Sequence, residues 1–574
     1  MTMAEQDINH LLTSFKDVDA YTHGQLPLVA AYCRCLQFTE TINTLVESEM
    51  QLSPGQAVTA MVLDVLSGRS PLYHVKDFLA TQDVELLLGE DLDPELFSDY
   101  TLGRSLDAIA AFGTGRIVTE LGIKAVQQFQ LDTSAVSFDT TSTSVWGEYE
   151  RDKEEAGPKI VHGHSKDNQP QLKQFMTELL CVDRGVPIFS RVLDGNASDK
   201  TLNNEMLQRI GKLMKAHGLG PGAFIYVADS AMVTQDNLSL MGNNRFISRL
   251  PANFNVCEKV IQEAIGQDAW SEARIVQEIA PSPKRPPAQY KTFETTVEID
   301  GAVYRAVVIH SSAHDKRRQK KVERQLESSM KTMEKEIRKL QAEFFCEADA
   351  RRIVQEACKC KGGLHVIRGD IQALEVRRRG RPSKNQPSPT TTRYRVTWTI
   401  EENKPAVESL VNLAGCFVLI TNVPGSDHDS LDGFGVLRVY KGQYGVETDF
   451  AFLKDPLIVN DLFLKTPARI DALGMILVLS LLIARLMEVH MRRYLDIHDQ
   501  TVVGLNDIKT KKPTYYAMTC GVRHVQVLVL NHQRILKNPL SDRQSQYLKA
   551  LGLDQSVFTD SSCIPAIITL NRSS

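Results

Sequence analysis

Apolar residues recur with a helical period through roughly the first 130 residues of the chain. The segment LPLVAAYCRCL, starting at Leu26, predicts one helix, and GQAVTAMVLDVL predicts another. The second helix is expected to begin at Ser53, because a serine cap followed by Pro54 at the first helical position is a typical helix start. The pattern predicts a helical N-terminal domain, which suits a role in binding DNA ends as well as any other helical role.

A strand-like pattern replaces the helical one from about Leu131. AVSFD predicts a short strand that ends at Asp139, and AFIYVAD at 223–229 is apolar throughout, as in a central strand covered on both faces. Between them, QLKQFMTELLCVDRGVPIFSRVL predicts a hairpin that turns at 183–185. These strands, followed by helices, predict a mixed α/β layer.

A different pattern interrupts this layer from about residue 246. Apolar residues there are spaced by three and four, which predicts a helical arm or short coiled coil. They are Val322, Leu326, Met330, Met333, Ile337, Leu340 and Phe344. TTRYRVTWTI then alternates like a strand and carries Trp398. Farther on, the longest apolar run, 472–484, is shorter than the ~20 residues that span a bilayer, so it predicts a buried core helix.

These changes of pattern predict five regions along the chain. They are a helical N-terminal domain (1–130), the first part of an α/β core (131–245), an α+β insertion (246–425), the second part of the core (426–495) and a helical C-terminal region (496–574).

The segment YKGQYGVETDFAFLK predicts one helix with four of its polar side chains on one side. At about 100° per residue, Tyr440, Gln443, Glu447 and Lys454 fall on a narrow polar arc beside an apolar stripe. A phenol, an amide, a carboxylate and an ammonium group would then share the rim of a buried face. An ordinary amphipathic helix has the same pattern, so this segment requires partners elsewhere in the chain.

Two aspartates supply such partners. Asp139 and Asp229 each end a predicted strand, and the carboxyl ends of neighbouring strands are where an open α/β sheet places ligands. With Glu447 they would form a cluster of three carboxylates, the hard oxygen ligands that hold Mg²⁺ or Mn²⁺. Two such ions in one site can activate water and stabilise the leaving oxygen in phosphodiester cleavage.

A basic segment in the predicted insertion is a second candidate for DNA contact. Arg379 and Arg381 belong to the run RRRGRPSK, an extended basic element able to lie in a narrow minor groove. A solvated, flexible loop would have the same composition.

Composition limits the choice of function without deciding it. The chain has 66 Lys+Arg against 70 Asp+Glu, a formal charge of −4, which excludes a uniformly basic nucleic-acid binder but allows local basic patches. The two C-x-C pairs have no partners at zinc-finger spacing. The polar start MTMAEQDINH does not resemble a signal peptide, so we expect a cytoplasmic protein with reduced thiols and no membrane association.

Four segments together resemble the DDE transposases of bacterial insertion sequences. They are SFDTTSTSVWGEY, HGHSKDNQPQLKQFMTELLCVDRGVPIFSRVLDGNASD, YVADSAM and DGFGVLRVYKGQYGVETDFAFLKDPL. The last is similar to the branch marked by Tyr-x2-Arg-x3-Glu-x6-Lys, matched at Tyr440, Glu447 and Lys454, with Gln443 where that branch most often has arginine. The resembling blocks run from about 139 to 490, and the N-terminal portion also resembles the helical domain fused to such enzymes.

This resemblance implies an RNase H-like (retroviral-integrase-like) catalytic core interrupted by the insertion. Asp139 on the first strand, Asp229 on the fourth and Glu447 on a later helix would be the catalytic metal ligands for two Mg²⁺ (or Mn²⁺) ions. Tyr440, Gln443 and Lys454 would contact phosphate near the cleaved strand. Trp398 is the candidate for the insertion aromatic that stacks on a flipped base in relatives, although a buried core tryptophan is the commoner identity.

The leading hypothesis is a DNA transposase that cuts at the ends of its mobile element and transfers the strands into target DNA. It would act as a homodimer on double-stranded DNA, bound to terminal inverted repeats and target, in the bacterial cytoplasm near the nucleoid. Two alternatives remain: a nuclease of the same fold without strand transfer, and a transposase-derived protein that binds DNA without catalysis.

Overall fold

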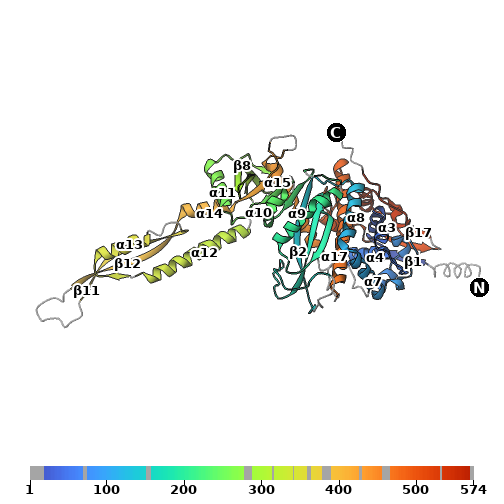
Figure 1. Cartoon of the computed structure of the whole chain (residues 1–574), viewed down its shortest axis with the longest axis horizontal. Helices are drawn as coiled ribbons and strands as arrows, with labels where there is room; N and C mark the ends of the chain where they lie inside the picture. The colour runs from blue at the N-terminus through green and yellow to red at the C-terminus, as the bar shows by residue number, and fades with distance from the viewer. Residues whose placement is uncertain are drawn as a thin grey trace, which may run out of the picture. The chain divides into compact units, whose positions relative to one another are not determined.

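The computed structural model describes most of the chain and divides it into two compact units. The described residues are 18–68, 74–149, 157–216, 218–220, 222–242, 244–276, 287–312, 316–340, 342–358, 363–377, 390–425, 430–454, 466–530 and 533–568. Unit 1 comprises Met1–Ser248 and Val439–Ser574, and unit 2 comprises Arg249–Arg438 (Figure 1). Both are mixtures of helices and strands, as the α/β prediction requires.

The N-terminal part of unit 1 is largely helical, as predicted. Its elements are β1 (Val18–Thr22), α2 (Leu26–Cys35), α3 (Phe38–Leu45), α4 (Pro54–Ser67), α5 (Val75–Ala80), α6 (Val84–Leu88), α7 (Asp99–Phe112) and α8 (Thr114–Phe129). The predicted start of α4 is confirmed, because the Ser53 hydroxyl accepts a hydrogen bond from the backbone N–H of Gln56, whose side chain in turn reaches the Ser53 backbone. Such a capping box fixes where the helix begins.

Five strands that pair side by side, with two helices, follow in unit 1. The elements are β2 (Ala135–Val145), β3 (Lys173–Val182), β4 (Val186–Leu193), α9 (Asp199–Ala216), β5 (Ile225–Ala228), α10 (Gln235–Met241) and β6 (Arg245–Arg249). The strand order is β4-β3-β2-β5-β6, with β2, β5 and β6 parallel and β3 and β4 antiparallel to their neighbours. The β3–β4 hairpin turns at 183–185 as predicted, with all three residues at positive φ.

Strand β2 is longer than predicted, which changes the position of Asp139. Thr140 to Val145 continue the strand and pair with β3 as far as Val145 opposite Lys173. The β-branched threonines that follow Asp139 favour extended backbone. The expectation that Asp139 ends a strand is therefore wrong, because it lies in the middle of one.

The remainder of unit 1 is built on one long helix. The last residues of α15 (Gly433–Gly442), together with α16 (Tyr444–Leu453), precede α17 (Pro467–Ile497). α17 contacts α2, α4, α7, α8 and β4. Among described helices it alone is long and apolar enough to cross a membrane, yet 89% of its most apolar window is buried inside the protein. It is the buried core helix that the apolar run predicted.

The C-terminal region is not purely helical, which corrects that prediction. It contains β14 (Val502–Val503), β15 (Lys509–Thr510), α18 (Tyr515–Val522), β16 (Gln526–Leu530), β17 (Gln533–Leu536) and α19 (Asp542–Ala550). β16 lies between β17 and β1 in an antiparallel sheet. Short strands such as VDAYT and QVLVL are stable here because each supplies the other's missing partner.

Unit 2 contains a sheet with flanking helices and a separate arm. Its elements are α11 (Asn255–Gln267), β7 (Arg274–Ile275), β8 (Gln289–Ile299), β9 (Ala302–Ser311), α12 (Lys316–Lys339), β10 (Glu343–Phe344), α13 (Glu347–Cys358), β11 (His365–Arg377), β12 (Thr390–Glu402), α14 (Lys404–Ala414) and β13 (Cys416–Thr421). Within it, β13, β9, β8 and β7 pair in that order, and β12 lies between β10 and β11.

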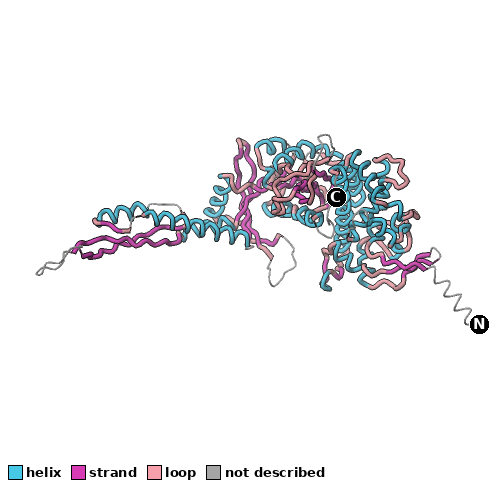
Figure 2. The backbone as a smooth tube through the Cα atoms, turned by 90° about the horizontal axis from the view of Figure 1, so that it is seen from below, coloured by secondary structure: helices cyan, strands magenta, loops and turns pink. Residues whose placement is uncertain are grey.

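We call residues 316–404 the arm. α12 and α13 both contact the β11–β12 hairpin, and they lie alongside it in Figures 1 and 2. The predicted heptad helix is confirmed only as far as Lys339. Phe344 instead belongs to β10, where it pairs with Tyr394 and packs in a small core with Ala350 and Val396.

Candidate active site

Asp139 and Asp229 come together on neighbouring strands of unit 1. β2 and β5 are parallel, with Ser137 opposite Val227, and each aspartate lies two residues beyond this pair. Because side chains alternate along a strand, both carboxylates lie on the side of the sheet set by that pair. The prediction that the two aspartates belong to neighbouring strand segments is confirmed, with Asp139 inside β2 and Asp229 directly after the last residue of β5.

The electrostatics of this pair are unfavourable in the protein alone. The pKa of Asp139 is raised to about 7, chiefly by burial. Lys166 and the backbone N–H of Thr140 oppose this rise, and the negative charges of Asp229 and Asp199 add to it. Burial likewise raises the pKa of Asp229, and Asp199 adds to the rise. Carboxylates held together with too little positive charge are typical of functional sites.

Asp199 and Lys166 form a polar cluster beside this pair. The ammonium of Lys166 lies 3.2 Å from a carboxylate oxygen of Asp199 and donates to the backbone oxygen of Thr140 at 2.7 Å. The Thr140 hydroxyl donates to Asp199 at 2.6 Å. Asp199 is the first residue of α9 and lies 59 residues from Thr140 in the chain. Its place at the first turn of α9 gave no sign that it would meet β2.

The predicted helix at 440–454 is broken, and this is a correction. α15 ends at Gly442 and α16 begins at Tyr444, with Gln443 between them. The hydrogen bonds at the break span three residues: the Gln443 N–H donates to the Tyr440 carbonyl, and the Val446 N–H donates to the Gln443 carbonyl. Glycine disfavours a helix interior, which explains why the break follows Gly442.

The N-terminal turn of α16 packs directly on the β3–β4 turn. A Cβ atom at Gly445 would overlap the backbone carbonyl of Arg184. A glycine is therefore required for this close approach.

The buried side of α16 is fixed to α17 by ion pairs. Asp449 is 0% exposed and accepts from Nε of Arg485 at 2.6 Å. Arg485 also donates to Glu488 at 2.7 Å and to the Thr448 hydroxyl at 3.2 Å. This network was not predicted from the sequence, because Asp449 and Arg485 are 36 residues apart in the chain.

Glu447 and Lys454 lie on the flank of α16 rather than on its buried face. Glu447 is exposed, whereas Val446, Phe450 and Leu453 are buried. Lys454, two turns farther on, lies 2.6 Å from a carboxylate oxygen of Asp167. Asp167 is next in sequence to Lys166, which contacts Thr140. The Lys454–Asp167 ion pair therefore connects the end of α16 to the loop beside Asp139.

Tyr440 and Gln443 are not on the same helix as Glu447. Tyr440 is half-buried near the end of α15, and Gln443 is 9% exposed at the break. The single polar arc is thus divided between two helices, although α16 itself contacts β2.

The remaining predicted DNA contacts belong to unit 2. Arg379 and Arg381 lie outside the described residues. Trp398 is half-buried on the covered face of β12, next to the cluster of Phe344, Ala350 and Val396. That position is typical of a core tryptophan.

The donor set fits a divalent cation at two of its three predicted positions. Asp139 and Asp229 are hard oxygen donors whose raised pKa values show that added positive charge would stabilise them. Among the residues that the structure describes, no three acidic, histidine or cysteine side chains are close enough to hold a metal ion. The exposed side chain of Glu447 is therefore not gathered with the two aspartates in this conformation.

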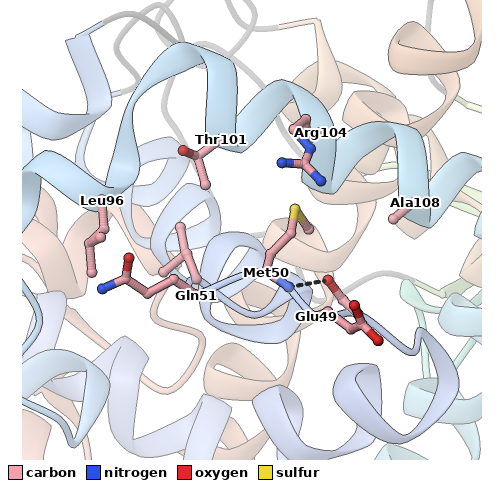
Figure 3. Close-up of a pocket in the computed structure, with 9 residues that line it drawn as sticks. Glu49, Met50, Gln51, Leu96, Thr101, Arg104 and Ala108 are labelled. Atoms are coloured by element: carbon pink, nitrogen blue, oxygen red, sulfur yellow. Dashed lines mark hydrogen bonds between the residues drawn. The ribbon is translucent and has the colours of Figure 1, made fainter.

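A pocket of about 520 Å³ in the N-terminal part of unit 1 is separate from these residues. Thr101 and Arg104 of α7 line it opposite Met50 and Gln51 (Figure 3). None of the predicted site residues is among those lining it.

Comparison with known proteins covers only the beginning of the chain. Residues 18–123, from β1 into α8, match a domain of unknown function, DUF4277. No curated protein matches the chain significantly. The match includes neither aspartate nor α16.

Proposed function

We propose that the chain is a DNA transposase of the DDE class that cleaves and joins phosphodiester bonds with divalent metal ions. The observation that carries this proposal is the placement of Asp139 within β2 and of Asp229 directly after the adjacent parallel strand β5, both with raised pKa values. In chain order these are the first and fourth strands of a sheet arranged β4-β3-β2-β5-β6. That order supports an RNase H-like core, the fold that the sequence resemblance implies.

In this proposal Asp139, Asp229 and Glu447 hold Mg²⁺ or Mn²⁺, which when bound supplies an activated water and charge stabilisation at the leaving oxygen. Hydrolysis joins the water oxygen to phosphorus and breaks the bond to the 3′-oxygen, which leaves as a hydroxyl. In strand transfer that hydroxyl attacks a target phosphate and displaces the target's own 3′-oxygen. Lys454 and Tyr440 would contact the phosphate backbone beside the cleaved bond.

Glu447 is proposed as the third ligand from its place on α16, which is fixed at both ends. Gly445 packs on the β3–β4 turn, and Lys454 pairs with Asp167. Asp199 is the competing third carboxylate, since its charge affects both aspartates. Its existing bonds to Lys166 and Thr140 favour a structural role.

The test is cleavage of a supercoiled plasmid that carries the DNA flanking the gene, with Mg²⁺ or Mn²⁺. Asp139→Asn, Asp229→Asn and Glu447→Gln are each expected to abolish strand cleavage, and Asp199→Asn to reduce it while leaving activity measurable. Asp236→Asn, an exposed acid on α10, is the matched control and should cleave like wild type. Wild-type cleavage by both Asp139→Asn and Glu447→Gln would refute the proposal.

The same assay separates the alternatives. A nuclease without strand transfer would cut the plasmid but leave no joined products. A binding protein derived from a transposase would bind the flanking DNA without metal and never cut it.

A further inference from the structure

Positive charge is concentrated in the arm of unit 2. Residues 316–404 contain 23 lysines and arginines against 12 aspartates and glutamates, a formal charge of +11 in a chain whose total is −4. Residues 18–130 have the opposite balance, with 15 acidic against 6 basic side chains. A polyanion is therefore attracted to the arm much more strongly than to the N-terminal region.

Helix α12 arranges part of this charge in a row. At about 100° per residue, five of its exposed basic residues fall within about 60° of arc. We call this set the basic stripe: Lys320, Arg324, Lys331, Lys335 and Arg338. The half-buried apolar residues of the same helix, such as Leu326 and Met333, fall on the opposite side.

The fold holds the basic stripe toward solvent. α12 contacts β11, β12 and α14. The Ser329 hydroxyl on its apolar side is hydrogen-bonded to Nδ1 of His365 on β11 at 3.0 Å. Because the arm covers that side, the opposite side of α12 is open.

The five charges of the basic stripe are also available for a partner. All five side chains are exposed. Among the described residues of α12, Lys339 forms an ion pair with Glu336, and neither residue belongs to the stripe. Solvated surface charge is ordinary, but alternation of sign is then typical, and here one narrow arc carries a single sign.

We propose that the basic stripe binds the phosphate backbone of a DNA duplex. From Lys320 to Arg338 the helix extends about 27 Å, comparable to most of one turn of duplex. The stripe contains only lysine and arginine, with no amide or aromatic side chain. It is suited to phosphate contacts that position DNA without reading its sequence. The identity of the polyanion rests on the proposed transposase function.

The test measures binding of a 30-base-pair duplex by the full chain carrying Asp139→Asn, without divalent metal, across a salt series. A second protein, the stripe variant, has the same Asp139→Asn background and also replaces all five stripe residues with glutamine. Five phosphate contacts contribute about −4 to −5 to the slope of log K against log salt, so the variant's slope should be shallower by about that amount. The matched control exchanges lysine and arginine at the same five positions and should retain the wild-type slope.

Removing negative charge from the same helix should have the opposite effect on DNA affinity. Neutralising Glu323, Glu327 and Glu334 with glutamine should tighten binding. Equal affinity and slope for the glutamine-stripe variant and its control would overturn the proposal. So would tighter binding of an RNA duplex than of DNA.

Failure here is distinguishable from failure of the transposase assignment. If wild-type protein cleaves its flanking DNA in an Asp139-dependent way but the stripe variant binds normally, only the stripe proposal fails. If the stripe variant loses affinity but Asp139→Asn cleaves like wild type, only the catalytic assignment fails.

Discussion

Replacing Arg485 tests whether the buried network between α16 and α17 holds the candidate catalytic helix in place. The side chain of Arg485 is 18% exposed, and its partners Asp449 and Glu488 are 0% and 4% exposed. Arg485→Met removes the positive charge shared by two buried carboxylates. Glu488 keeps Arg492 at 2.9 Å and the backbone N–H of Tyr515 at 2.8 Å, whereas Asp449 loses its ion-pair partner.

The expected cost is about 3–5 kcal/mol, the range for leaving one member of a buried ion pair uncompensated. Arg469→Met is the matched control, because Arg469 lies on the same helix and pairs with Asp107 at 2.7 Å in a more exposed setting. An exposed pair contributes about 0–1 kcal/mol, so the control should be close to wild type.

Native-state hydrogen exchange of the α16 and α17 amides is the suitable assay. A chain of two units is not expected to unfold in a single step, whereas hydrogen exchange reports the free energy of local opening at each helix. Strand cleavage should fall with the loss of protection in α16. The double variant Asp449→Leu and Arg485→Met should recover much of the protection, because the buried charge is then removed as well. The reasoning is refuted if Arg485→Met costs no more than Arg469→Met.

Three further perturbations follow from single contacts. Burial lowers the pKa of His490 to about 4, so as pH drops from about 6.5 toward 4 the unfolded chain binds the proton first and the folded state loses stability, by about 2 kcal/mol at pH 5. His490→Gln should flatten this part of the profile of unfolding free energy against pH, and an unchanged pH dependence would contradict the reasoning. Gly445→Ala should displace α16 from the carbonyl of Arg184 and lower both melting temperature and cleavage, whereas a variant as stable as wild type would show that the contact yields easily. Asp167→Asn should cost under about 1 kcal/mol and tighten DNA binding by releasing Lys454, and weaker binding would argue against a phosphate contact there.

The sequence predicted the elements whose signal is local. The start of α4, the β3–β4 hairpin and the buried helix α17 each depend on residues close together in the chain, and each prediction is confirmed. The two aspartates were also found from sequence, because each follows a recognisable apolar strand segment. Errors appeared where neighbours decide the outcome, as in the extension of β2 by pairing with β3 and the break before α16.

The sequence by itself determined that Asp139 and Asp229 each follow an apolar, strand-forming segment, since hydrophobic pattern is a property of the chain. The pairing that makes β2 and β5 neighbours is a tertiary contact across about 90 residues. Only the tertiary structure decided which charges surround them, because Asp199 and Lys166 come from separate segments of the chain to meet beside β2. Burial then changes the ionisation of the site: an aspartate in solvent has a pKa near 3.8, whereas the pKa of Asp139 is raised to about 7. The arm shows the same division, because periodicity places five basic residues on one arc, whereas packing against β11 decides that this arc faces solvent.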